Sequence, residues 1–142
     1  MIYHKKIAAS NRTLSKIKNY SGVILFGTGN LGKIVLKALE KAKINIVAIA
    51  DNNESNWNKA WGGYKVLSNT QLEDSKNKYP VIIASFNFPY MKRQLEEIGI
   101  TNYFDSDFLF SEFKLDLSKC ETNWSPARCK EQLDLYIYSV NA

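Results

Sequence analysis

Apolar residues in this chain occur in two arrangements, which predict two kinds of element. Short continuous apolar runs, bounded by polar or turn-forming residues, are typical of strands buried on both faces of a sheet. The chain carries such runs at residues 23–26, 44–50 and 81–85, and shorter ones predict strands at 64–67 and 100–104.

Other segments space their apolar residues as one face of a helix does. Residues 31–42 show this spacing, with charged residues between the apolar ones, and they predict a helix directly after the first strand. Leu14 and Ile17, three residues apart, indicate a leading helix within residues 1–20.

Two further helices are indicated by the residues that would begin them. Ser68 and Gln71 form the sequence pattern of a capping box, so a short helix should start there. Pro89 suits the first turn of a helix, and Gly99 suits its carboxyl end.

The order strand, helix, strand indicates a βαβ unit with a right-handed crossover. The predicted fold is therefore α/β, a Rossmann-like three-layer α/β/α sandwich with a mainly parallel sheet. A length of 142 residues suits one domain. We expect a core module at residues 22–105 and a tail at 106–142, which packs against the sheet and ends in a helix that starts at Ser125-Pro126.

Charge and composition narrow the classes of partner. The net charge is +5, but the nineteen basic residues are spread along the chain, which disfavours nucleic acid and suits a phosphorylated small molecule. No apolar run is long enough for a signal peptide or a membrane span, so we expect a cytoplasmic protein without a membrane partner. The spacing of Cys120, Cys129 and His4 predicts no metal site.

The main functional motif is G-x-G-x-x-G, at Gly27-Thr28-Gly29-Asn30-Leu31-Gly32, between the first predicted strand and the next helix. Asp51 lies 19 residues after Gly32, at the end of the second predicted strand, which is the position of the acidic residue in a dinucleotide-binding fingerprint. Gly27 would permit the tight turn, Gly29 the approach of a pyrophosphate, and Gly32 the close packing of helix on strand.

The chemistry of such a site follows from its backbone and its carboxylate. The N–H groups from Asn30 to Gly32, at the positive end of the helix dipole, would bind phosphate oxygens. Asp51 would accept hydrogen bonds from a ribose diol, and because Asn52 and not an arginine follows it, NAD is favoured over NADP. The alternative is that the glycines only allow a tight turn and Asp51 only caps a strand.

Two other segments have both a binding and a structural interpretation. Ser85 and Asn87 follow a central strand and would either touch the sugar or phosphate of a ligand or form an ordinary loop. The segment from Trp57 to Gly63 would either cover a base or, as we favour, pack its tryptophans and turn at its glycines.

The run from Val23 to Asp105 resembles a small Rossmann-like module of polysaccharide and sugar-nucleotide biosynthesis proteins, including the N-terminal regions of FkbM-type methyltransferases and of sugar-nucleotide dehydratases. The matching segments are LFGTGNLG at 25–32, IADNN at 49–53, WGGYKVLS at 61–68 and VIIAS at 81–85. The resemblance implies binding of a nucleotide or nucleotide-sugar, with contacts at Gly27, Thr28, Gly29, Asn30, Leu31 and Asp51.

The chain departs from the catalytic members of these groups. No tyrosine is followed by a lysine four residues later, as a short-chain dehydrogenase would require. Phe26 stands before the first glycine, where a methyltransferase would usually carry an acidic residue, so S-adenosylmethionine is the less favoured ligand.

Three functions agree with these patterns. We favour a binding module that holds NAD or a nucleotide-sugar and acts with a partner enzyme or as a homo-oligomer in sugar-nucleotide or polysaccharide biosynthesis. The second is an enzyme or enzyme fragment of sugar-nucleotide metabolism. It would be an NAD-dependent dehydrogenase, an NAD-dependent dehydratase, or a protein associated with a methyltransferase. The third is an assembly protein whose glycine turn holds no ligand.

Overall fold

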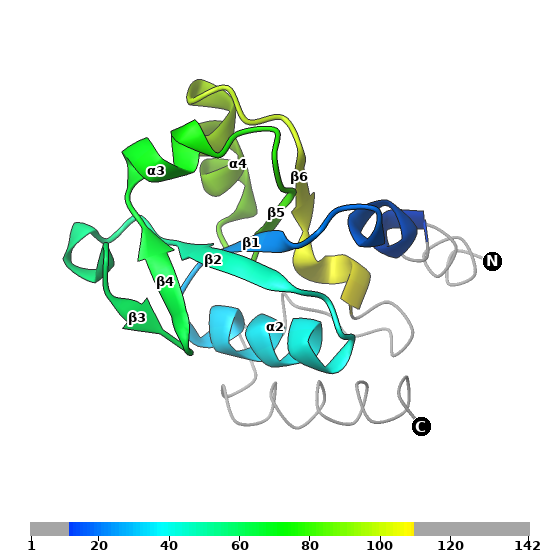
Figure 1. Cartoon of the computed structure of the whole chain (residues 1–142). Helices are drawn as coiled ribbons and strands as arrows, with labels where there is room; N and C mark the ends of the chain where they lie inside the picture. Colours follow the sequence, from blue (N-terminus) through cyan, green and yellow to red (C-terminus); the bar gives the residue numbers. More distant parts are fainter. Residues whose placement is uncertain (1–11, 110–142) are drawn as a thin grey trace.

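The structure is a computed structural model that describes residues 12–109, and a six-stranded sheet lies at its centre (Figure 1). The strand order is β3-β4-β2-β1-β5-β6, so β1 lies between the strand that follows it and a strand from the second half of the chain. In chain order the strands are β1 (Val23–Phe26), β2 (Ile46–Ala50), β3 (Ala60–Trp61), β4 (Tyr64–Leu67), β5 (Val81–Ile83) and β6 (Tyr103–Asp105).

The sheet is parallel except at one edge. β1 pairs in parallel with both β2 and β5, and β4 and β6 extend the parallel sheet on either side. Only the two-residue β3 runs antiparallel, to β4. The order of connection reverses between β1 and β5, which is the point in open α/β sheets where ligands bind.

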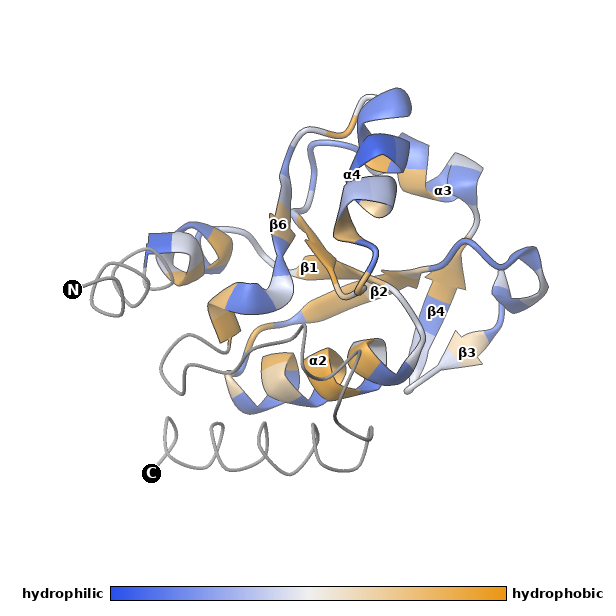
Figure 2. Ribbon diagram, turned by 180° about the vertical axis from the view of Figure 1, so that it is seen from behind, coloured by the Kyte–Doolittle hydropathy of each residue, from blue (hydrophilic) through white to orange (hydrophobic). Residues whose placement is uncertain are grey.

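Helices cover both faces of the sheet (Figures 1 and 2). α2 (Asn30–Lys41) lies on one face together with the helical residues 12–18 and η2 (Ser106–Leu109). α3 (Asn69–Asp74) and α4 (Phe88–Glu97) lie on the other. The predicted three-layer α/β/α arrangement is confirmed.

Successive side chains of a strand point to opposite faces of the sheet, so the strands contribute to two hydrophobic cores, one on each face. In β1, Val23 and Leu25 face the α2 side, whereas Ile24 and Phe26 face α3 and α4. All four are at most 2% exposed, so this central strand is buried on both faces, as its continuous apolar run predicts. Figure 2 shows β1 and β2 mainly in the colour of hydrophobic residues.

Local signals explain where the helices begin. Ser68 caps α3 by accepting from the N–H of Gln71, and the Gln71 side chain accepts from the N–H of Ser68, so the predicted capping box is present. Pro89 lies in the first turn of α4, and Gly99 follows that helix with a φ of +86°. Ile17 of the leading helix is buried against the core.

The structure differs from the predicted strands in four places. The second strand starts at Ile46, two residues later than expected, and the last strand covers Tyr103–Asp105 instead of residues 100–104. The fourth predicted strand ends at Ile83, before the loop that carries Ser85. The antiparallel strand β3 was not predicted. The expected tail and terminal helix at residues 110–142 lie outside the described residues.

Candidate functional site

The carboxyl ends of three adjacent strands meet at the point where the order of connection reverses. The N–H of Gly27, directly after β1, donates to the carbonyl of Ala50 at the end of β2 at 3.0 Å. The N–H of Ala84, directly after β5, donates to the carbonyl of Phe26 at 2.9 Å. These hydrogen bonds hold the glycine turn between the residues that follow β2 and those that follow β5.

The backbone packing of the protein requires glycine at two of the three fingerprint positions. Gly27 has a φ of +129°, and a side chain there would meet the carbonyl oxygen of Ala84. A side chain at Gly32 would meet the carbonyl oxygen of Gly27, because α2 passes directly against the turn. Both agree with the roles expected from the motif.

Gly29 is different from the other two. A Cβ on Gly29 would have no atom of the described chain within 4 Å, and its φ of −76° is open to any residue. Nothing in the packing therefore requires glycine at this position. A residue without a side chain here leaves the backbone of the turn open to a ligand.

The first turn of α2 starts at this open glycine. Gly29 is the N-cap, and no side chain caps the helix. Its carbonyl accepts from the N–H of Lys33, but within residues 12–109 no acceptor receives the N–H groups of Asn30, Leu31 and Gly32. The side chain of Leu31 is buried in the core, so Leu31 can contact a ligand only through its backbone. Three backbone donors at a positive helix end suit a phosphate group.

Asp51, directly after β2, is held in one orientation by two donors. The Thr28 hydroxyl donates to Oδ2 of Asp51 at 2.8 Å, and Nδ2 of Asn56 donates to the same oxygen at 2.5 Å. Oδ1 has no hydrogen-bond partner among residues 12–109. One carboxylate oxygen is therefore fixed by the protein, and the other is left to accept from a ligand.

Asn56 supports the Asp51 carboxylate, and the sequence analysis did not identify it. It lies in η1 (Glu54–Asn56), a short helix that Asn53 caps by accepting from the N–H of Ser55 at 3.1 Å. This cap gives a polar loop a fixed shape and brings Asn56 back to Asp51. Asp and Asn directly after a strand are the sequence signal for such a cap.

The segment after η1 supports Asp51 from the backbone side. Nε1 of Trp57 donates to the main-chain oxygen of Asp51 at 2.7 Å. Both Trp57 and Trp61 are partly buried and pack against the core on the α2 side, and Gly62 and Gly63 form the β3–β4 turn with φ of +61° and +89°. The geometry agrees with the packing interpretation of these tryptophans.

The other predicted site residues lie around this centre. Nδ2 of Asn52 donates to Oε1 of Gln94 on α4 at 2.8 Å, which links the end of β2 to the opposite layer. Oγ of Ser85 accepts from the N–H of Asn87 at 3.0 Å, so this hydroxyl shapes its own loop, and Asn87 is exposed. Both residues lie in the loop between β5 and α4, and their contact with a ligand stays a prediction.

The end of β6 adds a carboxyl group with altered acidity. Burial, and the nearby charge of Asp107, raise the pKa of Asp105 to about 6. Oδ1 of Asp105 accepts from the N–H of Asp107 at 3.2 Å. The neighbouring Ser106 is fully buried, and its hydroxyl has no hydrogen-bond partner within the described part of the chain.

Residues 12–109 contain neither a metal-binding cluster nor a membrane-spanning helix. No group of three His, Cys, Asp or Glu side chains there could hold a metal ion, and Cys120, Cys129 and His4 lie outside that range. None of the described helices has the length and apolar character that crossing a membrane requires.

A mainly parallel sheet, a glycine turn at the change in connection order and a carboxylate at the end of the next strand define a Rossmann-like α/β domain. The chain belongs to the C2185-like family, whose N-terminal part it matches over residues 19–104. A comparison with curated proteins gave no match.

Among the solved structures that resemble the chain are two of RSP. One is RSP in complex with β-NADH, which is 26% identical, with a TM-score of 0.46 over 66% of this chain and 50% of that one. The other is RSP in complex with β-NAD⁺ and operator DNA, which is 20% identical, with a TM-score of 0.48 over 87% of this chain and 63% of that one. The chain thus spans less than two thirds of either protein.

Proposed function

We propose that this chain is a nucleotide-binding module that holds NAD or a nucleotide-sugar at the carboxyl edge of β1 and β2. The observation that carries the proposal is the carboxylate of Asp51, whose Oδ2 is fixed by Thr28 and Asn56 while Oδ1 is left without a partner among residues 12–109. The partly buried carboxylate thus keeps one oriented oxygen at the edge of the sheet that can accept from the hydroxyl groups of a ligand.

The glycine turn supplies the second half of the same site. The diphosphate of the ligand would lie over Gly29 and accept from the N–H groups of Asn30, Leu31 and Gly32. The ribose would then donate from its diol to Oδ1 of Asp51, which the Thr28 hydrogen bond ties directly to the turn. NAD and nucleotide-sugars share this nucleoside diphosphate, which is the chemistry that the two halves would recognise.

The charge at Asp51 also favours one class of dinucleotide. A 2′-phosphate would approach a carboxylate whose neighbours in the chain are Ala50 and Asn52, with no adjacent arginine. NADP should therefore bind more weakly than NAD. We propose further that the bound ligand serves a separate enzyme or a second copy of the chain in sugar-nucleotide biosynthesis, for which the four matching sequence segments are the support.

The test is isothermal titration of the purified protein with NAD⁺, NADH, NADP⁺, a UDP-sugar and S-adenosylmethionine. We expect binding of NAD or the UDP-sugar, and a ligand at a hundred times its Kd should also stabilise the fold by about 2.7 kcal/mol. Asp51→Asn should weaken this binding, because the amide presents a donor as well as an acceptor to the ribose. The exposed Asp74 gives the matched control, Asp74→Asn, which should bind as the parent does.

Two results would reject the proposal. One is the absence of heat and of stabilisation with every ligand. The other is equal binding by the parent and Asp51→Asn. A short DNA duplex, titrated at low salt, tests the expectation that nucleic acid is not a partner, since phosphate contacts by lysine and arginine would weaken steeply as salt is added.

A further inference from the structure

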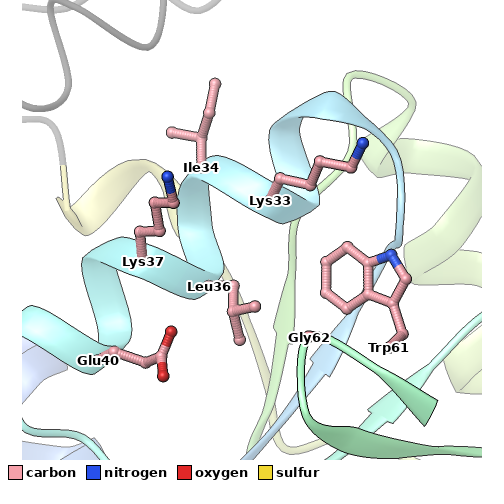
Figure 3. A pocket seen from close by; sticks show the side chains of 7 residues that line it. All are labelled: Lys33, Ile34, Leu36, Lys37, Glu40, Trp61 and Gly62. Carbon is pink, nitrogen blue, oxygen red and sulfur yellow. The ribbon is translucent and has the colours of Figure 1, made fainter.

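A pocket of 330 Å³ lies between α2 and the β3–β4 turn (Figure 3). Sites for small molecules usually enclose about 300–1,000 Å³, so this volume suits a small ligand. α2 forms one wall, and the β3–β4 hairpin forms the other through Trp61 and Gly62. The lining residues are Lys33, Ile34, Leu36, Lys37, Glu40, Trp61 and Gly62.

The hairpin is fixed against α2, so both walls of the pocket are held in place. A Cβ on Gly62 would meet Cδ2 of the buried Leu36, which shows how closely the turn approaches the helix. Further along α2, the Tyr64 hydroxyl donates to Oε2 of Glu40 at 3.2 Å. Trp61 packs against the core on the same side of the sheet. These contacts form the pocket from the protein alone, without help from a ligand.

The charges around the pocket favour an anionic ligand. Lys33 and Lys37 are four residues apart in α2, so they lie on the same side of the helix, and both line the pocket. Among residues 12–109, no acceptor receives the ammonium group of Lys33. The carboxylate of Glu40, by contrast, already accepts from Tyr64. Lys33 is also the fourth residue of α2, near the helix end whose dipole attracts negative charge.

The space between these charged groups is apolar. Leu36 and the indole of Trp61 lie between Lys33 and Glu40, as Figure 3 shows. Trp61 is only partly buried by the protein. An indole has a large apolar surface on which an aromatic ring packs in an offset or edge-to-face arrangement. The pocket therefore combines an ammonium group with a surface suited to a flat, apolar ring.

We propose that this pocket binds a small aromatic anion, with its carboxylate or phosphate group at Lys33 and its ring between Trp61 and Leu36. The proposed nucleotide site is a neighbour, because a Cβ on Gly32 would lie 3.6 Å from Cη2 of Trp61. The two sites use different groups, however. The nucleotide site uses backbone N–H groups and Asp51, whereas the pocket uses side chains of α2 and the hairpin, so each can be tested apart from the other.

Titration of 2-naphthoate into the isotope-labelled full-length protein, followed by NMR, tests this proposal. The indole signal of Trp61 and the amide signal of Lys33 should shift. The indole signal of Trp57, which donates to Asp51, should shift less. A ligand of this size should bind with a Kd of about 1 mM. 2-Naphthyl phosphate is titrated in the same way, and the tighter binder of the two identifies the anionic group that the site prefers.

Two controls isolate the charge. 2-Naphthamide has the same ring without the negative charge and should bind about fivefold more weakly than 2-naphthoate. Lys33→Gln should weaken the binding of 2-naphthoate by a similar factor but leave that of 2-naphthamide unchanged. Lys65→Gln removes an exposed lysine of β4 that does not line the pocket, and it should bind as the parent does. The amide spectrum shows whether each variant is folded.

Three results would overturn the proposal. The first is an unshifted Trp61 signal with both anions at about 10 mM, ten times the expected Kd. The second is equal affinity for 2-naphthoate and 2-naphthamide, or equal affinity of the parent and Lys33→Gln for 2-naphthoate. The third is binding that Gly29→Ala abolishes, since the anion would then occupy the proposed phosphate site. Failure to bind NAD would reject the nucleotide site and leave this proposal standing.

Discussion

The hydroxyl of Thr28 lies 2.8 Å from Oδ2 of Asp51 and donates to it, so the glycine turn after β1 is tied directly to the residue that follows β2. In the fingerprint pattern, Thr28 is an unspecified position between two glycines. Here its side chain sets the direction of the carboxylate. Thr28 is therefore a positioning residue for the proposed ribose contact as well as a part of the turn.

Thr28→Val removes this donor while keeping the shape of the side chain. Asn56 still holds Oδ2, so we expect the carboxylate to lose part of its orientation and the affinity for NAD to fall about tenfold, or about 1.4 kcal/mol. Titration calorimetry measures the change. Thr28→Ser keeps the hydroxyl and should bind nearly as the parent does. Equal affinity of the valine and serine variants would show that the hydrogen bond has no part in binding.

Gly29→Ala should weaken nucleotide binding without harming the fold. The new methyl meets no atom of the described chain, and the backbone angles of Gly29 suit alanine. Alanine is a poorer N-cap than glycine, which destabilises the helix, but it also makes the unfolded chain less flexible, which stabilises the fold. The two effects nearly cancel, so the free energy of unfolding should change by less than about 1 kcal/mol. Thermal unfolding with and without NAD measures both effects.

Gly32→Ala is the contrasting variant, because its methyl would collide with the carbonyl of Gly27. It should lower the melting temperature even without ligand. A stable Gly32→Ala protein, or a Gly29→Ala protein with unchanged affinity, would contradict the division of roles between these glycines.

Asp105→Asn should stabilise the protein at pH 7 but not at pH 4. The pKa of Asp105 is raised to about 6 in the folded protein, against 3.8 for a free side chain, so the folded state favours the protonated form. This contribution to stability is complete below pH 4 and is lost as the pH rises through 6. Because the group is partly exposed, the gain at pH 7 should be only about 1 kcal/mol.

Urea unfolding of the parent and Asp105→Asn across this pH range checks the sign. The asparagine keeps an oxygen for the N–H of Asp107, so that local hydrogen bond is preserved. Asp74→Asn, at an exposed position, again serves as the matched control for the change of a carboxylate to an amide. A difference that grows as the pH falls would show that the ionised form is the stabilised one.

Tyr103 should ionise at a higher pH than a free tyrosine side chain. Its hydroxyl donates to Oε1 of Glu96 at 2.5 Å, and this hydrogen bond, with burial and the charge of Glu96, raises the pKa of Tyr103 to about 12. The stability from this contact is complete below pH 10 and is lost as the pH rises through 12. Phenolate absorbance measured against pH should lose a component near 12 in Tyr103→Phe, and in Glu96→Gln that component should move toward 10.

The sequence predicted most of the elements. Two strands, β2 and β6, start later than predicted, and both delays have the same physical cause. After α2, the N–H of Ile44 donates to the carbonyl of Leu39, and after α4 the N–H of Ile100 donates to the carbonyl of Leu95. Each isoleucine closes a Schellman motif and packs its side chain back against the helix. An apolar residue in this position looks like the start of the next strand, although its backbone still belongs to the end of the helix.

The central features of the site were predictable because they depend on local sequence. The sequence shows both a glycine turn after a buried strand and an aspartate at the end of the next strand. The sheet brings them together, with the Thr28 hydroxyl 2.8 Å from Oδ2 of Asp51. The support by Asn56 was not visible. It depends on a tight loop shape, and polar residues in a loop carry no periodicity that would single one out.

The hairpin of β3 and β4 was missed for a related reason. Two residues, Ala60 and Trp61, are too few for an alternating pattern, although the Gly62-Gly63 pair after them is a strong hairpin signal. Without a recognisable strand before it, the glycine pair predicts only a turn.

The position of β1 in the middle of the sheet has a consequence for how the protein folds. Leu25 of β1 pairs with Ile49, which is close in the chain, and with Ile82, which is far from it in the chain. Because closing a long loop slows folding, the pairing of β1 with β5 should form later than the pairing of β1 with β2. The hydrogen bond between Ala84 and Phe26 forms only when β5 has docked. The turn at Gly27 reaches its final shape after that step, so a refolding chain should gain its helices before it gains the ability to bind a nucleotide.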